Sequence, residues 1–364
     1  MNKEVISDKQ GIYLMIIFII GTAVLIVPGL DAKQDLWLAN ISAMFMALPM
    51  VLIYARLYYL FPSKDLFDII EICFNKFIGK TICILYVWYV FHSTSLVLLN
   101  FGLFVHTIAF IRTPKVIPMI GISILCTWVV KEGLEVISRC TELFLEVLMA
   151  LGFIVVLLLI PDIDVNNLLP ILYDGIQPVA EGAFSSFSFP FGEVVVFSMA
   201  FSTFKKINSS YKIYTLGLLI GGSILTVTSL ITISVIGVNI ASNSYFPAYK
   251  SISLIDIGDL LQRLEIVMAI AYTLGVFVKI SIYLLATSKG IVKLFGFNNH
   301  RFIVTLVSLL IINLSYFVHD SIMYNMEWTS EIWTYYAFPF QVIFPIIIWI
   351  TAEIKRKKYN NQNM

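Results

Sequence analysis

The chain has 364 residues, of which 59% are hydrophobic and 13% are charged, with a formal net charge of +1 at pH 7. Soluble globular proteins carry about 25% charged residues, so this composition excludes an ordinary soluble protein and indicates an integral membrane protein. The near-neutral charge leaves no basic stripe that would match a phosphate backbone. We therefore expect no nucleic acid partner.

The apolar runs predict ten transmembrane helices within a single domain over residues 1–364 that ends in short tails. A helix that crosses a bilayer needs about 20 apolar residues, and clusters of charged and turn residues separate the runs. The first run lacks a small-residue cleavage site, so we expect a retained span rather than a signal peptide. The predicted spans cover residues 10–31, 37–60, 80–110, 115–131, 138–160, 181–204, 213–238, 262–288, 302–317 and 333–352.

Lysine and arginine residues are distributed unevenly between the two sides of these spans. Of the 24 basic residues, 18 fall on the side that holds both termini, 5 fall on the other side, and Lys279 falls inside the eighth span. Short cytoplasmic loops are rich in lysine and arginine, so both termini are predicted to be cytoplasmic. The basic cluster at 355–358 is predicted to be a stop-transfer anchor or a contact for anionic membrane lipid.

Two of the spans contain residues that disturb a helix. The first has Gly21 at mid-depth and a Pro-Gly pair near its outer end, and the sixth has Pro190 and Gly192 at mid-depth. Ten spans with breaks in the first and sixth divide into a five-plus-five inverted repeat, with halves at about 10–160 and 181–352. Interrupted helices in corresponding positions indicate a binding site at the membrane midplane. Two unrelated kinks are the alternative.

The break in the sixth span places backbone polar groups beside a carboxylate. Pro190 has no amide hydrogen, and an unwound segment leaves N–H and C=O groups facing a cavity. These groups suit an amino acid, which carries a carboxylate and an ammonium. The sequence leaves four alternative roles for Glu193. It can face the ligand ammonium, carry a proton, pair with a lysine, or lie in a water-filled crevice without a specific role. The predicted ligand-binding residues are Gly21, Thr22, Ala23, Phe189, Phe191, Gly192 and Glu193.

Lys279 is the second charged residue that the apolar pattern does not explain. A lysine at the centre of a membrane helix costs about 2.5–3.5 kcal/mol on insertion scales, so its side chain should face the bundle. It lies near the depth of Gly21. We predict that its ammonium holds unwound carbonyls of the first helix, in place of a coupling ion. Snorkelling to the cytoplasmic interface is the alternative.

The fifth span opens with Arg139, Glu142 and Glu146. Residues three or four apart share a helix face, so these side chains predict a cytoplasmic ion-pair cluster, with a proton path as the alternative. The four histidines and four cysteines lack the spacing of metal ligands. We expect no metal site, no cofactor and no enzymatic activity.

Several stretches resemble the B subunit of nutrient germinant receptors from endospore-forming bacteria. These are LPIL followed by GIQP within residues 169–178, FPFGE at 189–193, and GVFVKIS at 275–281 with Tyr283. Gly21 and Thr22 fit the opening pattern of the first helix in that family. The resemblance covers essentially the whole chain.

The resemblance implies a LeuT-like fold, because such subunits are similar to the amino acid-polyamine-organocation permeases. It implies a multi-pass protein of the spore inner membrane that binds a small ligand such as an amino acid. Its expected partners are a larger membrane A subunit and a lipoprotein C subunit. The alternative is a proton-coupled amino-acid transporter that uses Glu193 and Lys279, and a channel role is compatible with the receptor. Ala23 replaces a second glycine of permease-like relatives, so no particular ligand is implied.

Overall fold

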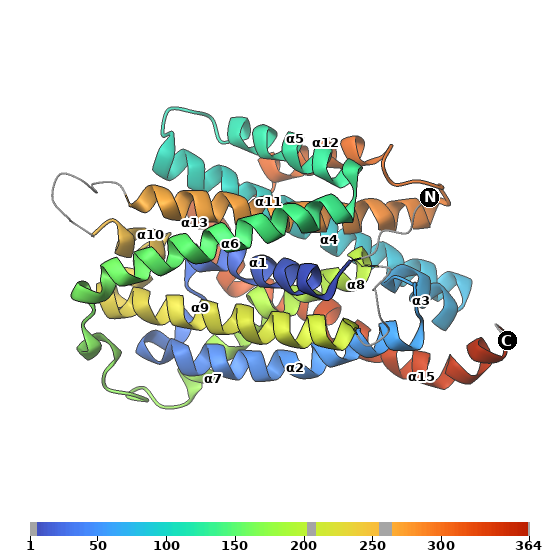
Figure 1. Cartoon of the computed structure of the whole chain (residues 1–364), viewed down its shortest axis with the longest axis horizontal. Coiled ribbons are helices and arrows are strands. Elements are labelled where there is room, and N and C mark those ends of the chain that lie inside the picture. The colour runs from blue at the N-terminus through green and yellow to red at the C-terminus, as the bar shows by residue number, and fades with distance from the viewer. Residues whose placement is uncertain (1–5, 202–208, 255–263, 363–364) are drawn as a thin grey trace.

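The structure is a computed structural model that describes residues 6–201, 209–254 and 264–362. Long helices run side by side along the longest axis of one bundle (Figure 1). The helices are α1 Asp8–Ile26, α2 Leu36–Leu60, α3 Leu66–Cys73, α4 Lys76–Phe104, α5 Val116–Glu132, α6 Leu134–Leu159, α7 Gln177–Ser186, α8 Phe197–Ala200, α9 Ser209–Ser242, α10 Pro247–Ile252, α11 Glu265–Phe295, α12 Val304–Phe317, α13 Ile322–Glu331, α14 Trp333–Phe338 and α15 Phe344–Gln362.

The all-helical membrane class is confirmed, whereas the number of spans is only partly reproduced. Among the described residues, eight helices are long and apolar enough to cross a membrane, or nine if α12 and α13, which meet at 99°, form one span. The predicted span at 115–131 corresponds to α5, which has 17 residues. The ten-span arrangement therefore stays a prediction.

Both ends of the described chain lie at the same end of the bundle. The first turn of α1 and the last turns of α15 are on the right in Figure 1. An even number of passes would produce this arrangement. Which side of the membrane this end faces is still a prediction from the lysine and arginine count.

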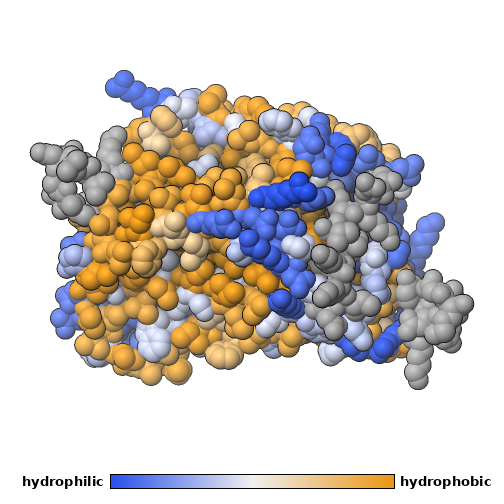
Figure 2. All heavy atoms as spheres, in the orientation of Figure 1, coloured by the Kyte–Doolittle hydropathy of each residue, from blue (hydrophilic) through white to orange (hydrophobic). Residues whose placement is uncertain are grey.

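The helix α1 lies in the core of the bundle, and the outer helices expose apolar side chains. Residues 14–23 of α1 are all buried, and α1 lies between α6 and α9 in Figure 1. By contrast, α6 exposes Leu143 and Phe153, which are 61% and 65% exposed. Figure 2 shows that hydrophobic residues cover much of this face. Such a surface matches bilayer hydrocarbon, so α1 is a central helix and α6 is a peripheral one.

The predicted interruption of the first helix at Gly21 is wrong. α1 is continuous from Asp8 to Ile26 and ends where Val27 takes a left-handed conformation, with φ 57°. The chain turns again at Gly29, where φ is 79°. Gly21 stays helical because no proline nearby removes a helical N–H. Its missing side chain allows close packing against Gly275 instead.

The short helix α3 is capped by the Asp65 carboxylate, whose pKa is shifted by its surroundings. The Asp65 side chain accepts a hydrogen bond of 3.0 Å from the Asp68 amide, which caps the helix. Burial, reinforced by the nearby Asp68 carboxylate, raises the pKa of Asp65 to about 6. The folded protein therefore disfavours the ionised form of this side chain.

A change of Asp65 should alter how stability depends on pH. A raised carboxyl pKa contributes stability at low pH that is lost as the pH rises through about 6. Asp65→Asn keeps a capping oxygen without the charge, so its thermal midpoint in detergent should fall less than that of the unmodified protein between pH 5 and 7. Asp31→Asn, at an exposed position, is the control. Identical pH profiles for Asp65→Asn and the unmodified protein would contradict the prediction.

Candidate functional site

The sixth predicted span is interrupted, as its proline and glycine predict. After α7 the backbone forms a π-turn over Phe187–Phe191 and a 3-10 turn over Gly192–Val196 before α8 begins. Phe189 leaves helical geometry, with φ −140° and ψ 116°. The residue before a proline is sterically disfavoured in the helical region, and Pro190 offers no N–H. The break is therefore a local consequence of the sequence.

A glutamine on the last predicted span supports this break. The Gln341 side chain donates hydrogen bonds to the Ser188 carbonyl at 2.9 Å and to the Tyr89 hydroxyl at 3.2 Å. A Cβ atom on Gly192 would collide with the Gln341 amide, so any other residue at this position would displace Gln341 from its hydrogen bonds. The sequence interpretation missed Gln341. An uncharged polar residue two positions after Pro339 in an apolar run was the available signal.

The break brings Glu193 to Lys279. The lysine Nζ lies 2.5 Å from Glu193 Oε2, and their side chains are 0% and 3% exposed. Lys279 also donates a hydrogen bond of 2.8 Å to the Thr22 hydroxyl. This geometry matches one of the alternatives for Glu193, which was pairing with a lysine. The lysine does not snorkel, and it binds a hydroxyl of α1 rather than an unwound carbonyl.

Aromatic rings enclose the ammonium of Lys279. Its Nζ lies 5.1 Å from the centroid of Phe18 and 4.6 Å from that of Phe189. A cation is attracted to the face of an aromatic ring within about 6 Å. The Tyr283 hydroxyl lies close to the Glu193 carboxylate. The buried charges are therefore held by contacts from α1, the broken helix and α11.

The other predicted ligand-binding residues lie around this pair in different ways. Gly21 faces Gly275 of α11, and a Cβ atom on Gly21 would lie 2.8 Å from the Gly275 Cα. Phe191 points toward Gly222 of α9. Ala23 is fully buried in the hydrophobic core. The structure thus joins Thr22, Phe189, Glu193 and Lys279 directly, and it places Gly21, Ala23, Phe191 and Gly192 in the surrounding packing.

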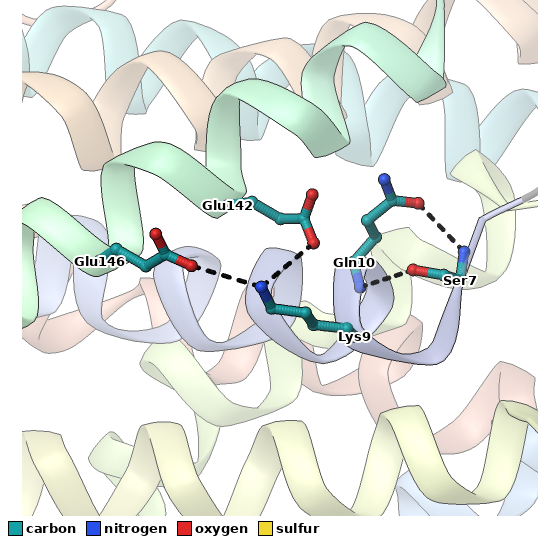
Figure 3. A network of polar contacts seen from close by, with 5 residues as sticks. All are labelled: Ser7, Lys9, Gln10, Glu142 and Glu146. Atoms are coloured by element: carbon teal, nitrogen blue, oxygen red, sulfur yellow. Dashed lines mark hydrogen bonds and ion pairs between the residues drawn. The ribbon is translucent and has the colours of Figure 1, made fainter.

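The ion pairs near the first turn of α1 differ from those predicted. Figure 3 shows Lys9 between Glu142 and Glu146 of α6, at 3.7 and 3.3 Å. Arg139 pairs instead with Glu135, at 2.5 Å. Arg139, Glu142 and Glu146 thus all form ion pairs, as the predicted cluster requires, but their partners are Glu135 and Lys9 rather than one another. A Ser7 and Gln10 capping box closes the start of α1 (Figure 3).

The part of the chain that the structure describes contains no group of three or more His, Cys, Asp or Glu side chains placed to hold a metal ion. The charged chemistry at the break consists of one carboxylate and one ammonium. Such a pair can exchange partners with a zwitterion or move a proton between its members.

Comparisons with known proteins agree with the family that the sequence resembles. The protein-family model described as Spore germination protein matches residues 5–321. The chain is 31% identical over 362 residues to Spore germination protein KB of Bacillus subtilis (strain 168). The aligned region covers 98% of this chain and 97% of that protein. It is 22% identical over 360 residues to Spore germination protein A2 of the same organism, covering 97% and 96%.

The backbone is similar to that of a solved transporter. This is a nucleobase-cation-symport-1 family transporter in a closed conformation with bromovinylhydantoin bound, with a TM-score of 0.67 over 97% of this chain and 90% of the other. The two sequences are 11% identical. The likeness shows a shared transporter-type fold of the LeuT class and nothing about the ligand.

Removing one member of the buried pair should destabilise the protein more than removing both. Glu193→Gln leaves the ammonium buried without a counter-ion, which typically costs about 3–5 kcal/mol. Lys279→Met leaves the carboxylate in the same state. The double variant buries no charge, so its unfolding midpoint in detergent should exceed that of either single variant. If the fall in unfolding midpoint of the double variant equals the sum of the falls in the two single variants, the two charges do not depend on each other.

The close approach of α1 and α11 should be sensitive to one methyl group. Gly275→Ala places a Cβ against the backbone of Gly21, and overpacking of this kind costs about 1–3 kcal/mol. Gly121→Ala is the matched control, because a Cβ there meets nothing within 4 Å. Thermal unfolding of both purified variants tests this. Equal midpoints would mean that the two helices can separate at no cost.

Proposed function

The chain belongs to the spore germination protein family, and we propose that it is the ligand-sensing membrane subunit of a nutrient germinant receptor. The proposal includes a ten-span five-plus-five inverted repeat in the spore inner membrane, with both termini cytoplasmic. It also includes assembly with a membrane A subunit and a lipoprotein C subunit. The match to Spore germination protein KB along the whole chain supports this assignment.

The observation that carries the ligand hypothesis is the buried pair of Glu193 and Lys279 at the helix break. Intramembrane ionisable residues are costly and are usually functional. A zwitterionic amino acid matches this pair, because its ammonium suits Glu193 and its carboxylate suits Lys279.

Ligand binding would change the contacts between three parts of the bundle. In the structure Lys279 connects Glu193 to Thr22 of α1. A ligand that takes over both charges loosens this connection and so favours a different packing of α1 against α11. A ligand shifts an equilibrium only through such differential contacts. Partner subunits would respond to the repacked state.

A proton-coupled amino-acid transporter is the second candidate. The transporter-type fold favours it, and a carboxylate paired with an amine can carry a proton. Both candidates need the same residues. They differ in whether the ligand crosses the membrane.

Deletion of the gene should separate the two candidates. For the receptor, spores that lack the protein fail to germinate with one defined nutrient, while uptake of that nutrient by vegetative cells is unchanged. Glu193→Gln should reproduce the loss or shift the response to higher nutrient concentration, with the protein still present in the membrane. Glu327→Gln, at an exposed position on α13, is the control. A normal dose response for Glu193→Gln would refute the assigned site, and impaired uptake would favour the transporter.

A further inference from the structure

A crevice of about 420 Å³ lies behind α1, on the side away from the ion pair. It opens between α6 and α9, with α1 and α11 as its floor and α10 closing one end. In Figure 1, α6 and α9 lie on one face with α1 between them. Ile20, Gly21 and Val24 of α1 line the crevice. Ile20 and Val24 are each about 200° around the helix from Thr22, and Gly21 is about 100° from it. The crevice and the ion pair therefore contact different faces of one helix.

The lining of this crevice suits an apolar occupant. Most of its side chains are aliphatic, including Val24, Val156 and Ile231. The hydroxyls of Thr228 and Thr232 donate to carbonyls of their own helix at 3.0 and 2.9 Å. These hydroxyls therefore have no hydrogen left to donate, and a polar molecule would lose its hydrogen bonds to water in a lining that is mostly apolar.

The mouth of the crevice faces the bilayer rather than water. Its rim includes Phe153 of α6 and Val227 of α9, which are 65% and 54% exposed. Both helices are long and apolar enough to cross a membrane, so these apolar rims contact lipid tails. The volume falls in the range of about 300–1,000 Å³ that is usual for bound ligands. Space also remains beside Gly152, where a Cβ would meet nothing within 4 Å.

We propose that this crevice binds an acyl chain of a membrane lipid. The chain enters between α6 and α9 and packs against Val24 of α1 and Ala271 of α11. It thereby supports the back of the helix whose front carries Thr22. This inference does not depend on the identity of the nutrient or on the receptor assignment.

The test is photolabelling of the full-length protein in phosphatidylcholine nanodiscs. A trace of the lipid carries a diazirine in the middle of one acyl chain, and labelled residues are identified by mass spectrometry after illumination. Label is expected on the floor residues Val24 and Ala271 as well as on the rim residue Phe153. Label confined to the rim in the unmodified protein overturns the proposal, whatever any variant does.

A filling variant identifies the crevice as the source of the floor label. Gly152→Phe occupies the open space and should reduce labelling of Val24 and Ala271 by about fourfold to fifteenfold, the change expected from losing the burial of one or two methylene groups. Gly121→Phe on α5, where a Cβ also meets nothing within 4 Å, should leave the floor label unchanged. An equal floor label in both variants contradicts the proposal. Floor labelling by a water-soluble diazirine amino acid, in place of the lipid, would assign the crevice to a soluble ligand.

Discussion

The buried ion pair between Glu193 and Lys279 is the interaction on which the centre of the bundle depends. Each charge alone would be very costly at this depth, and the pair is tolerable only because both members are present and have further contacts. Lys279 obtains these from the Thr22 hydroxyl and from the rings of Phe18 and Phe189. The broken helix, α1 and α11 are consequently coupled through a single ammonium group.

The geometry of this coupling depends on how closely α1 approaches α11. Gly21 and Gly275 let the two backbones touch, and any side chain at either position would separate them. This contact keeps Thr22 within hydrogen-bond distance of Lys279. The apolar crevice lies on a different side of α1. Changes at either face of α1 can therefore reach the ion pair through a displacement of one helix.

Local chemistry explains which parts of the site were predictable. The break at Phe189 follows from Pro190, whose ring and missing N–H act on its own neighbours. The need for Lys279 to face inward follows from the cost of charge in hydrocarbon. Gly21 was misinterpreted because glycine serves two purposes in a membrane helix. It can allow unwinding, or it can allow close packing, and only the position of Gly275 distinguishes them.

The sequence by itself determined the membrane class, the positions of most helices, the break in the sixth span and the presence of two buried charges. These properties depend on composition and on interactions between residues near each other in the chain. The tertiary structure decided that Glu193 and Lys279 meet, that Gln341 supports the break and that Lys9 takes the carboxylates of α6. Such contacts join distant parts of the chain. Several residues of suitable charge are available to each of these side chains, and the packing of the helices decides which one becomes its partner.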